Sequence, residues 1–258
     1  MIDRNLALKL VQGRPWHHDF EIIPGVRTHG SYDPSVLWKD LQLPEDLSGL
    51  TLADVGASNG YFSFTARHHG AQVVAFDFRH RDNSGFGLAQ HLNGMHEIEH
   101  HHVNVLEISA DRYGVFDIVL ALGLMYHVPD PFRALANCAQ LSRDRLLVES
   151  YCIDAVFPQL AAEPVMRFIS DPSRQPSQGQ PNEDWSNFWG FTSVCLRRMV
   201  EDIGFAVDRI LVRQDRVLID ARRSVSEPHT ARIERAYQLA PHLPVGKDVS
   251  DPASWKIF

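Results

Sequence analysis

The stretch Leu50–Phe64, LTLADVGASNGYFSF, constrains the fold more than any other part of the chain. An apolar, β-branched run carries Asp54 near its end, and Gly56 and Gly60 follow within six residues. The residues after Gly60 can form a helix. In a strand, glycine turn and helix of this kind, backbone N–H groups at the start of the helix face a ligand. The stretch therefore predicts a ligand-binding turn at the carboxyl end of a parallel strand.

The sequence after this stretch alternates between expected strands and expected helices. We expect strands at 50–55, 71–77, 100–105, 116–122 and 145–150, with helices at 60–69, 87–92 and 131–141. A helix at 192–203 and a hairpin of strands 205–212 and 216–222 follow. Strands connected by helical crossovers form a parallel, doubly wound sheet. The predicted fold class is therefore α/β, with a Rossmann-like, mostly parallel sheet that has an antiparallel hairpin at one edge.

The length of 258 residues suits one domain with additional segments. Residues 35–41 and 231–240 are further expected helices, as is the start of the chain. The expected organisation, in chain order, is an N-terminal wrapping segment at 1–49, a cofactor-binding core at 50–150, an insertion or lid at 151–190, a last helix and hairpin at 191–222, and a tail at 223–258.

Composition narrows the cellular setting and the partners. Three cysteines far apart in the sequence suit a reducing compartment, and the first residues lack the pattern of a signal peptide. No apolar run is long enough to span a bilayer, so we expect a cytoplasmic protein without membrane contact. The net charge of −7 with scattered Lys and Arg argues against nucleic acid as a partner without excluding it. The sequence is compatible with a homodimer.

Three ligands compete for the glycine turn. NAD(P) requires G-x-G-x-x-G, which the spacing of Gly56 and Gly60 does not match. A hydrolase nucleophile elbow, G-x-S-x-G, is matched literally around Ser58, but no strand with an oxyanion loop precedes it. S-adenosylmethionine needs an acidic acceptor for its ribose at the end of the next strand, and Asp77 is placed for that role.

Several of these motifs together resemble those of a known family. The motifs D-V-G-A-S-N-G-Y-F, V-V-A-F-D and F-D-I-V-L-A-L-G-L-M-Y-H are similar to successive motifs of class I S-adenosylmethionine-dependent methyltransferases. The resemblance covers roughly residues 25–222. More narrowly, L-G-L-M-Y-H-V-P-D-P-F-R-A-L, G-V-R-T-H-G and E-D-I-G-F resemble the bacterial tRNA wobble-uridine carboxymethyltransferase and its small-molecule methyltransferase relatives.

Two departures from the tRNA enzymes shape the expected acceptor. Those enzymes carry an additional N-terminal helical region, for which this chain is too short. They also use a lysine to hold the carboxyl group of carboxy-S-adenosylmethionine, and the approximate position here reads Trp16-His17-His18. These departures favour plain methyl transfer to a smaller acceptor.

The resemblance implies a set of cofactor contacts. Asp77 would bind the ribose hydroxyls, while the glycine turn would contact the methionine moiety. Residues at the ends of the following strands would surround the adenosine. The expected cofactor-binding residues are Asp54, Gly56, Ala57, Ser58, Gly60, Asp77, Phe78, Arg79, Asn104, Val105 and Leu122.

The segment after the fourth strand is the expected catalytic element, because carboxyl ends of parallel strands face the ligand. His127 is the candidate general base, since an imidazole can remove a proton at neutral pH. The alternative is that His127 only caps the next helix or shapes the pocket. Tyr126 is expected to pack against the cofactor. The candidate acceptor-binding residues are His29, Glu149, Trp185, Asn187 and Trp189.

One metal-binding pattern does not fit its surroundings. His96-Glu97-Ile98-Glu99-His100 reads H-E-x-x-H, which binds zinc only on a helix that places both imidazoles on one face. Here the pattern follows Gly94 and runs into an expected strand. We therefore expect no metal site.

Three functions remain in order of preference. The first is an S-adenosylmethionine-dependent methyltransferase that acts on an oxygen or nitrogen of a small molecule, such as a sugar or a specialised metabolite. The second is methyl or carboxymethyl transfer to the wobble uridine of tRNA. The third is a non-catalytic, cofactor-binding regulatory subunit.

Overall fold

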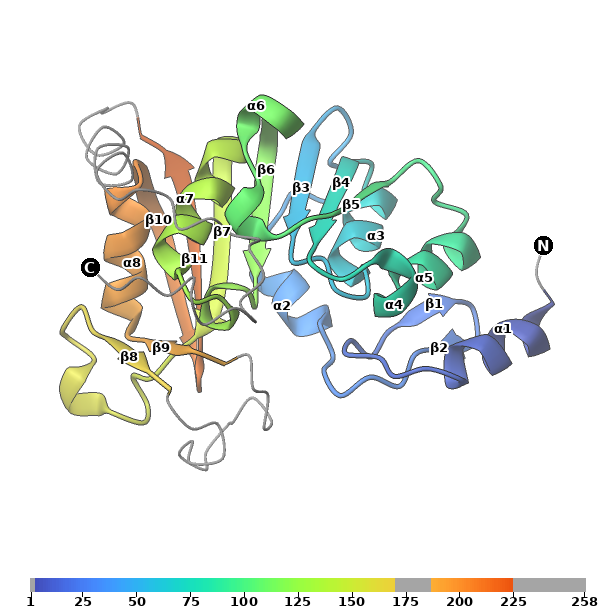
Figure 1. Ribbon diagram of the computed structural model, residues 1–258, viewed down its shortest axis with the longest axis horizontal. Coiled ribbons are helices and arrows are strands. Elements are labelled where there is room, and N and C mark those ends of the chain that lie inside the picture. Colours follow the sequence, from blue (N-terminus) through green and yellow to red (C-terminus); the bar gives the residue numbers. More distant parts are fainter. Residues whose placement is uncertain (1–2, 170–186, 225–258) are drawn as a thin grey trace, which may run out of the picture.

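The computed structural model describes residues 3–169 and 187–224, and Figure 1 shows their arrangement around a central sheet. Its seven strands lie in the order β10-β11-β7-β6-β3-β4-β5. Neighbours from β7 to β5 pair in parallel, whereas β11 pairs antiparallel with both β7 and β10. The strands are β3 (Thr51–Val55), β4 (Gln72–Asp77), β5 (Glu99–His102), β6 (Phe116–Leu122), β7 (Ser142–Tyr151), β10 (Phe205–Arg213) and β11 (Arg216–Arg223). The predicted fold class is confirmed.

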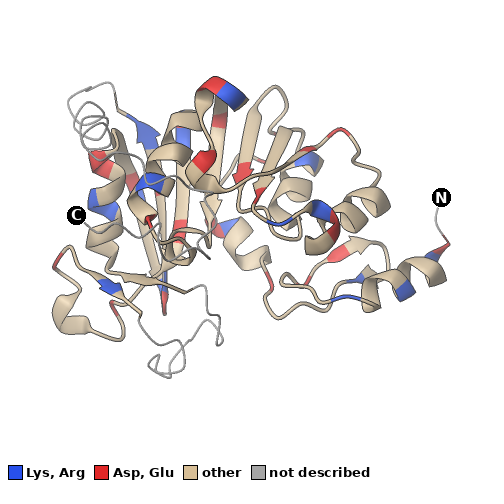
Figure 2. Ribbon diagram, viewed as in Figure 1, with Lys and Arg blue, Asp and Glu red and all other residues tan. Residues whose placement is uncertain are grey.

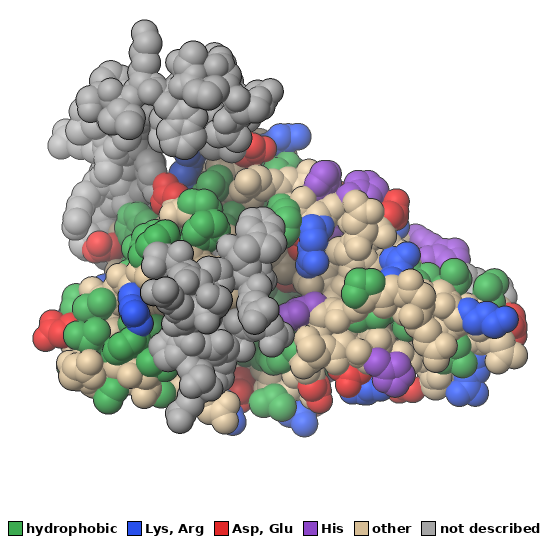
Figure 3. All heavy atoms as spheres, turned by 60° about the horizontal axis from the view of Figure 1, so that its bottom comes forward, with side chains coloured by type: hydrophobic (Ala, Val, Ile, Leu, Met, Phe, Trp, Pro, Cys, Tyr) green, Lys and Arg blue, Asp and Glu red, His purple; other side chains and the backbone are tan. Residues whose placement is uncertain are grey.

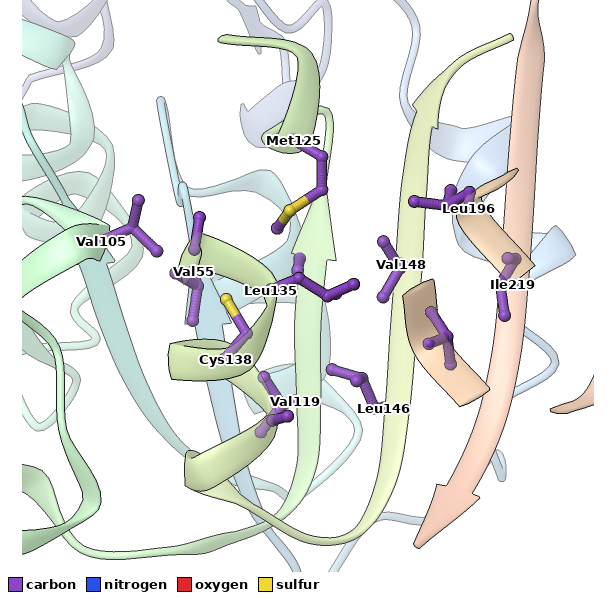
Figure 4. Close-up of a cluster of buried hydrophobic side chains, with 14 of the residues drawn as sticks. Val55, Val105, Val119, Met125, Leu135, Cys138, Leu146, Val148, Leu196 and Ile219 are labelled. Carbon is purple, nitrogen blue, oxygen red and sulfur yellow. The ribbon is translucent and has the colours of Figure 1, made fainter. Parts of the chain in front are cut away.

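Helices cover both faces of this sheet. Alternate residues of each parallel strand point to opposite faces. On β6, Val119 belongs to the cluster that contains α7 and α8 side chains, whereas Leu120 belongs to the cluster that contains α3 and α5 side chains. Figure 4 shows the first cluster, in which Leu135 and Leu196 pack against the sheet. The helices are α3 (Tyr61–His68), α4 (Arg81–Ser84), α5 (Phe86–Asn93), α6 (Ala110–Tyr113), α7 (Pro131–Leu141) and α8 (Ser193–Asp202).

Side-chain caps set the starts of the two helices that pack on the first cluster. Asp130 accepts a hydrogen bond from the Arg133 N–H at 3.0 Å, and Pro131 stands in the first turn of α7. Thr192 accepts one from the Cys195 N–H at 3.2 Å and begins α8. Both helix starts are as the sequence predicts.

The N-terminal segment lies along the second cluster. It contains α1 (Arg4–Gln12), the two-stranded β1 (Glu21–Ile23) and β2 (Val26–Arg27), and α2 (Ser35–Asp40). Ala7, Val11 and Phe20 are buried against α3 and α5 side chains. In Figure 1 the parallel strands end toward the bottom of the view, and this segment lies below β3, β4 and β5.

The region after β7 is less regular in its described part. It contains a short 3-10 helix η3 (Pro158–Leu160) and a two-stranded sheet of β8 (Met166–Phe168) and β9 (Trp189–Phe191). This small sheet lies below β7 in Figure 1, on the side where the parallel strands end. Trp185 and the expected helix at 231–240 lie outside the described residues.

Two strand boundaries differ from the expectation by more than one residue. The third strand of the parallel set ends at His102, because the Asn104 side chain accepts a hydrogen bond from the Leu106 N–H and begins the 3-10 helix η1 (Val105–Glu107). The strand expected at 145–150 is longer, because β7 pairs with β6 on one side and with β11 on the other. Across the described ranges, no helix has both the length and the apolar character that a membrane span requires.

Candidate active site

The glycine turn between β3 and α3 has the backbone conformation that its sequence requires. Gly56 and Gly60 have φ angles of 87° and 90°, a region that glycine enters without steric cost. The N–H groups of Gly56 and Ala57 both donate to the Phe76 carbonyl, at 2.8 and 3.1 Å. Ser58 also has a positive φ, of 52°. The turn is therefore fixed against the end of β4.

Asp77 joins the turn to the end of β4. One carboxylate oxygen accepts the Ser58 N–H at 2.7 Å, and the other accepts the Arg79 N–H at 2.8 Å. Arg79 also donates from Nη2 to the Ser58 Oγ at 3.0 Å. The Asp77 side chain is buried, and each oxygen has a second lone pair that these bonds leave available.

Asp54 lies deeper than Asp77, at the end of β3. Its carboxylate accepts a hydrogen bond from Ser63 Oγ on α3 at 2.6 Å. Burial raises the pKa of Asp54 to about 6, opposed by the Ser63 hydrogen bond and assisted by the charge of Asp77. The two acids thus lie at the carboxyl ends of neighbouring strands, as the spacing of the sequence predicts.

The other expected adenosine contacts lie around the ends of β4, β5 and β6. Phe78 is 66% exposed, with the Arg79 guanidinium 5.6 Å from its ring centre. Asn104 is exposed, whereas Val105 is buried and accepts a hydrogen bond from Asn137 through its carbonyl. Leu122 ends β6 and is half-buried.

Asn59 is a residue that the sequence analysis did not single out. Its Oδ1 accepts the backbone N–H groups of His17 and His18, at 2.8 and 3.0 Å. Its Nδ2 donates to the Ser84 carbonyl beside α5. One buried carboxamide therefore ties the N-terminal segment to the glycine turn. The sequence signal for it was a polar residue inside the predicted ligand-binding turn.

The segment after β6 contacts the glycine turn. A Cβ atom placed on Gly56 would lie 3.6 Å from Leu124 Cδ1, so the Leu124 side chain lies against the turn. The 3-10 helix η2 (Met125–His127) follows. Tyr126 is buried, His127 is half-buried, and their ring centres lie 4.1 Å apart. The candidate base therefore lies in the same short segment that contacts the glycine turn.

An ion pair between buried Glu149 and half-buried Arg216 lies next to this segment. Glu149 on β7 accepts hydrogen bonds from the Arg216 Nε and Nη2 and from the Gly123 N–H. Arg216 also donates to the Tyr126 hydroxyl at 3.2 Å, with its guanidinium 4.9 Å from the ring centre. Burial lowers the pKa of Arg216, but Glu149 and Tyr126 raise it well above the ordinary value.

Arg216 and Tyr32 were also absent from the sequence-based site. Arg216 begins β11, opposite Tyr151 at the end of β7, so the hairpin brings it beside Glu149. Predicting that Arg216 belongs to the site would have required the pairing register of β11 with β7. Burial, assisted by the charge of Glu149, raises the pKa of the Tyr32 phenol to about 12. The N-terminal segment thus reaches this part of the site as well.

The expected acceptor-binding residues have different surroundings. His29 is exposed, with a φ of 56°. Asn187 is buried, and neither polar atom of its side chain has a hydrogen-bond partner among the described residues. It precedes Phe188, whose N–H donates to the Tyr126 carbonyl at 2.8 Å. Trp189 uses its indole N–H to bind the Val128 carbonyl at 3.0 Å, which holds β9 to the η2 segment.

Figure 3 turns the side where the parallel strands end toward the viewer, and histidines are scattered over it among hydrophobic and charged side chains. The H-E-x-x-H stretch does not form a helix, because Glu99–His102 is strand β5. His100 packs on the Phe86 ring, and burial lowers its pKa to about 4. The two imidazoles of the motif therefore do not share a helix face.

The residues at the glycine turn fit a bound S-adenosylmethionine. Two buried nitrogen atoms beside the turn, Arg79 Nε and His18 Nδ1, have no hydrogen-bond partner among the described residues. Buried polar atoms without partners are rare and costly, so they are expected where a ligand completes the hydrogen bonds. Together with the lone pairs of Asp77, they offer both donors and acceptors to a polar ligand.

Comparison with known proteins identifies the class. A sequence profile described as a methyltransferase domain matches residues 36–210, which is more than half of the chain. The chain belongs to this family. Its strand order and glycine turn are those of the class I S-adenosylmethionine-dependent methyltransferases.

Individual relatives match only part of this chain, at low sequence identity. The chain is 34% identical over 99 residues to the ubiquinone biosynthesis O-methyltransferase of Aromatoleum aromaticum, covering 38% of this chain and 41% of that protein. It is 26% identical over 165 residues to the tRNA U34 carboxymethyltransferase of Helicobacter pylori, covering 60% and 63%. The chain thus matches less than two thirds of the length of either relative.

A solved structure shares the fold over most of its length. The N-terminal domain of EvdMO1, crystallised with SAH bound, superposes with a TM-score of 0.63 at 17% identity. The match covers 88% of this chain and 98% of that domain. At this identity the likeness establishes the fold alone.

Proposed function

We propose that this protein transfers the methyl group of S-adenosylmethionine to an oxygen or nitrogen atom of a small acceptor, such as a sugar or a specialised metabolite. The contact between Leu124 and Gly56 is the observation that supports this most directly. It joins the cofactor turn to the segment that carries Tyr126 and His127, so a methyl donor and a base would meet at one sheet edge.

On the cofactor side, the chain would supply acceptors, donors and close backbone approach. Asp77 would accept the ribose hydroxyls through its remaining lone pairs, and the turn would hold the methionine moiety. S-adenosylmethionine supplies an electrophilic methyl group when bound. The residues proposed to hold it are Asp54, Gly56, Ala57, Ser58, Gly60, Asp77, Phe78, Arg79, Asn104, Val105 and Leu122.

On the acceptor side, His127 would remove the proton of an O–H or N–H nucleophile. Positioning the nucleophile in line with the methyl group supplies much of the rate acceleration in such a displacement. Tyr126, held by Arg216, would form a rigid wall beside it. The proposed acceptor contacts are Glu149, Asn187, His29, Trp185 and Trp189. The Asn187 carboxamide beside the η2 segment has no hydrogen-bond partner among the described residues, which supports its inclusion.

Calorimetric titration with S-adenosylhomocysteine, followed by an acceptor screen with S-adenosylmethionine, tests this proposal. Asp77→Ala should chiefly weaken cofactor binding, and Ser58→Ala should keep much of the activity. His127→Ala should lower kcat by about 10²- to 10⁴-fold while the cofactor still binds. Full activity of His127→Ala would refute the role of the base, and absence of cofactor binding by the wild type would refute the proposal as a whole.

A tRNA acceptor is the alternative that the Helicobacter pylori relative raises. The described residues give it little support, because Figure 2 shows Lys and Arg interspersed with Asp and Glu along the helices and strands. Several of these basic side chains are paired, as in Arg197 with Glu201 and Arg222 with Asp144. Affinity for tRNA that falls steeply between 50 and 200 mM salt would favour this alternative.

A further inference from the structure

His18 in the N-terminal segment is a buried histidine whose position is fixed from several sides. Its N–H donates to Asn59 Oδ1 at 3.0 Å, and its carbonyl accepts the Thr28 hydroxyl at 2.7 Å. A Cβ atom on Gly30 would lie 2.3 Å from the His18 carbonyl carbon, so a second part of the segment packs directly behind it. The backbone therefore has no freedom to carry the imidazole away from the glycine turn.

The imidazole of His18 lies among aromatic rings at the start of α3. Its ring centre is 5.7 Å from Phe62 and 6.3 Å from Tyr61, both in the first turn of that helix. Burial, assisted by the charges of His17 and Arg79, lowers the pKa of His18 to about 3. The ring is therefore neutral at physiological pH, with one nitrogen that donates and one that accepts.

The Nδ1 atom of His18 has no hydrogen-bond partner among the described residues, and the side chain belongs to a residue only 6% exposed. Leaving such an atom unpaired costs free energy that a bound ligand can recover. Nearby, Arg79 Nε lies 3.6 Å from Asp77 Oδ1 and has no hydrogen-bond partner among the described residues. The N-terminal end of α3 carries a partial positive charge. Donors and positive potential together suit a carboxylate.

We propose that His18 is a cofactor-binding residue, which donates from Nδ1 to the carboxylate of the methionine moiety, and that Asn59 is the residue that positions it. This inference rests on the S-adenosylmethionine binding in the proposed function. It makes the N-terminal segment part of the cofactor site, because His18 would contact the ligand on the side opposite Gly56–Gly60. Asn59 in the glycine turn binds the backbone of the N-terminal segment and so holds the two sides together.

Calorimetry with two ligands distinguishes binding of the carboxylate by His18 from a purely structural role of this residue. S-adenosylhomocysteine carries the amino-acid carboxylate, whereas 5′-methylthioadenosine lacks it. His18→Leu should weaken binding of the first by about 10- to 100-fold, as expected for a lost hydrogen bond to a charged group, and of the second by less than about threefold. His18→Asn places an amide N–H near the Nδ1 position and should stay within about fivefold of the wild type.

His68→Leu, at the exposed far end of α3, is the matched control and should leave both affinities unchanged. Equal losses for the two ligands in His18→Leu, or no loss for either, would overturn the proposal. If His18→Leu does not fold, the imidazole ¹⁵N resonances of the wild type provide the test. The Nδ1 signal of His18 should shift with S-adenosylhomocysteine but not with 5′-methylthioadenosine. A wild type that binds neither ligand would refute the proposed function instead.

Discussion

At the scale of single residues, Asp54 shows how burial changes a carboxylate. Its one side-chain hydrogen bond, from Ser63, does not offset the loss of water, so the pKa rises to about 6 from an ordinary value near 3.8. Between these two values the folded protein binds more protons than the unfolded chain. Stability from this group is therefore greatest below about pH 4 and is lost as the pH rises through 6.

We expect this loss to be visible in the protein without cofactor. A difference of two pKa units corresponds to about 3 kcal/mol over the whole titration, of which about 1 kcal/mol is lost below pH 4.5. The wild type should therefore lose about 2 kcal/mol relative to Asp54→Asn between pH 4.5 and 7. Urea unfolding at both pH values measures it. The same substitution at exposed Asp111 should show no such difference. An unchanged gap between wild type and Asp54→Asn would contradict the prediction.

Gly60 is required for packing as well as for its backbone angle. A Cβ atom there would lie 2.5 Å from Phe64 Cε2 and 2.8 Å from Phe86 Cδ2, at a φ of 90°. Gly60→Ala should therefore destabilise the protein by about 2 to 5 kcal/mol, through backbone strain and overpacking together. Gly94→Ala also has a positive φ but open space around it, and should lose only about 1 to 2 kcal/mol. Equal losses in thermal or urea unfolding would contradict this assignment.

At the scale of elements, the antiparallel hairpin completes the site that the parallel strands begin. Pairing of β11 with β7 brings Arg216 to Glu149, whose side chain is only 4% exposed. The pair in turn holds Tyr126 of η2. A strand from the end of the chain thus fixes the segment that carries the candidate base.

Replacing one partner of this ion pair should lower the free energy of unfolding more than replacing both. Arg216→Met leaves the Glu149 charge buried and should destabilise the protein by about 3 to 5 kcal/mol, while the double variant with Glu149→Gln should recover at least about 1 kcal/mol. The exposed pair Arg197–Glu201 on α8 is the control, with an expected coupling below about 0.5 kcal/mol. Additive losses at Arg216 and Glu149 in a urea double-mutant cycle would contradict the coupling.

At the scale of the whole molecule, Arg145 connects three distant parts of the chain. On β7, its guanidinium donates to both carboxylate oxygens of Asp220 on β11, at 2.9 and 2.7 Å. The same group donates to the Leu41 and Gln42 carbonyls after α2. The N-terminal segment is therefore anchored to the antiparallel edge of the sheet as well as to the glycine turn.

Arg145→Lys should weaken this anchor although the charge is kept. Lysine cannot form the planar, two-pronged contact with Asp220 and still reach both carbonyls, so we expect a loss of about 2 to 3 kcal/mol in urea unfolding. Arg143→Lys, at a pair with Asp117 on the exposed side, should lose less than about 1 kcal/mol. Similar losses for the two variants would show that the anchor contributes little.

Local patterns predicted the elements well where one signal dominated. The bounds of β6 at 116–122 and α7 at 131–141 agree with the expectation, because continuous apolar runs and an Asp-Pro start are strong signals. The predicted end of the strand that corresponds to β5 was wrong. The Asn104 side chain redirects the backbone there, and the pattern of apolar residues gives no sign of that contact. The long β7 was underestimated, since its length depends on partners at both edges.

Strand period and glycine conformation are local properties of the chain, so the layered fold, the glycine turn and the spacing of Asp54 and Asp77 could be predicted from the sequence. That Arg216, Tyr32 and His18 lie on the side of the sheet where the parallel strands end could be learned only from the folded structure. Their contacts depend on hairpin register and on the path of the N-terminal segment. Both are set by packing between residues far apart in the sequence, which a single sequence does not encode in any local pattern.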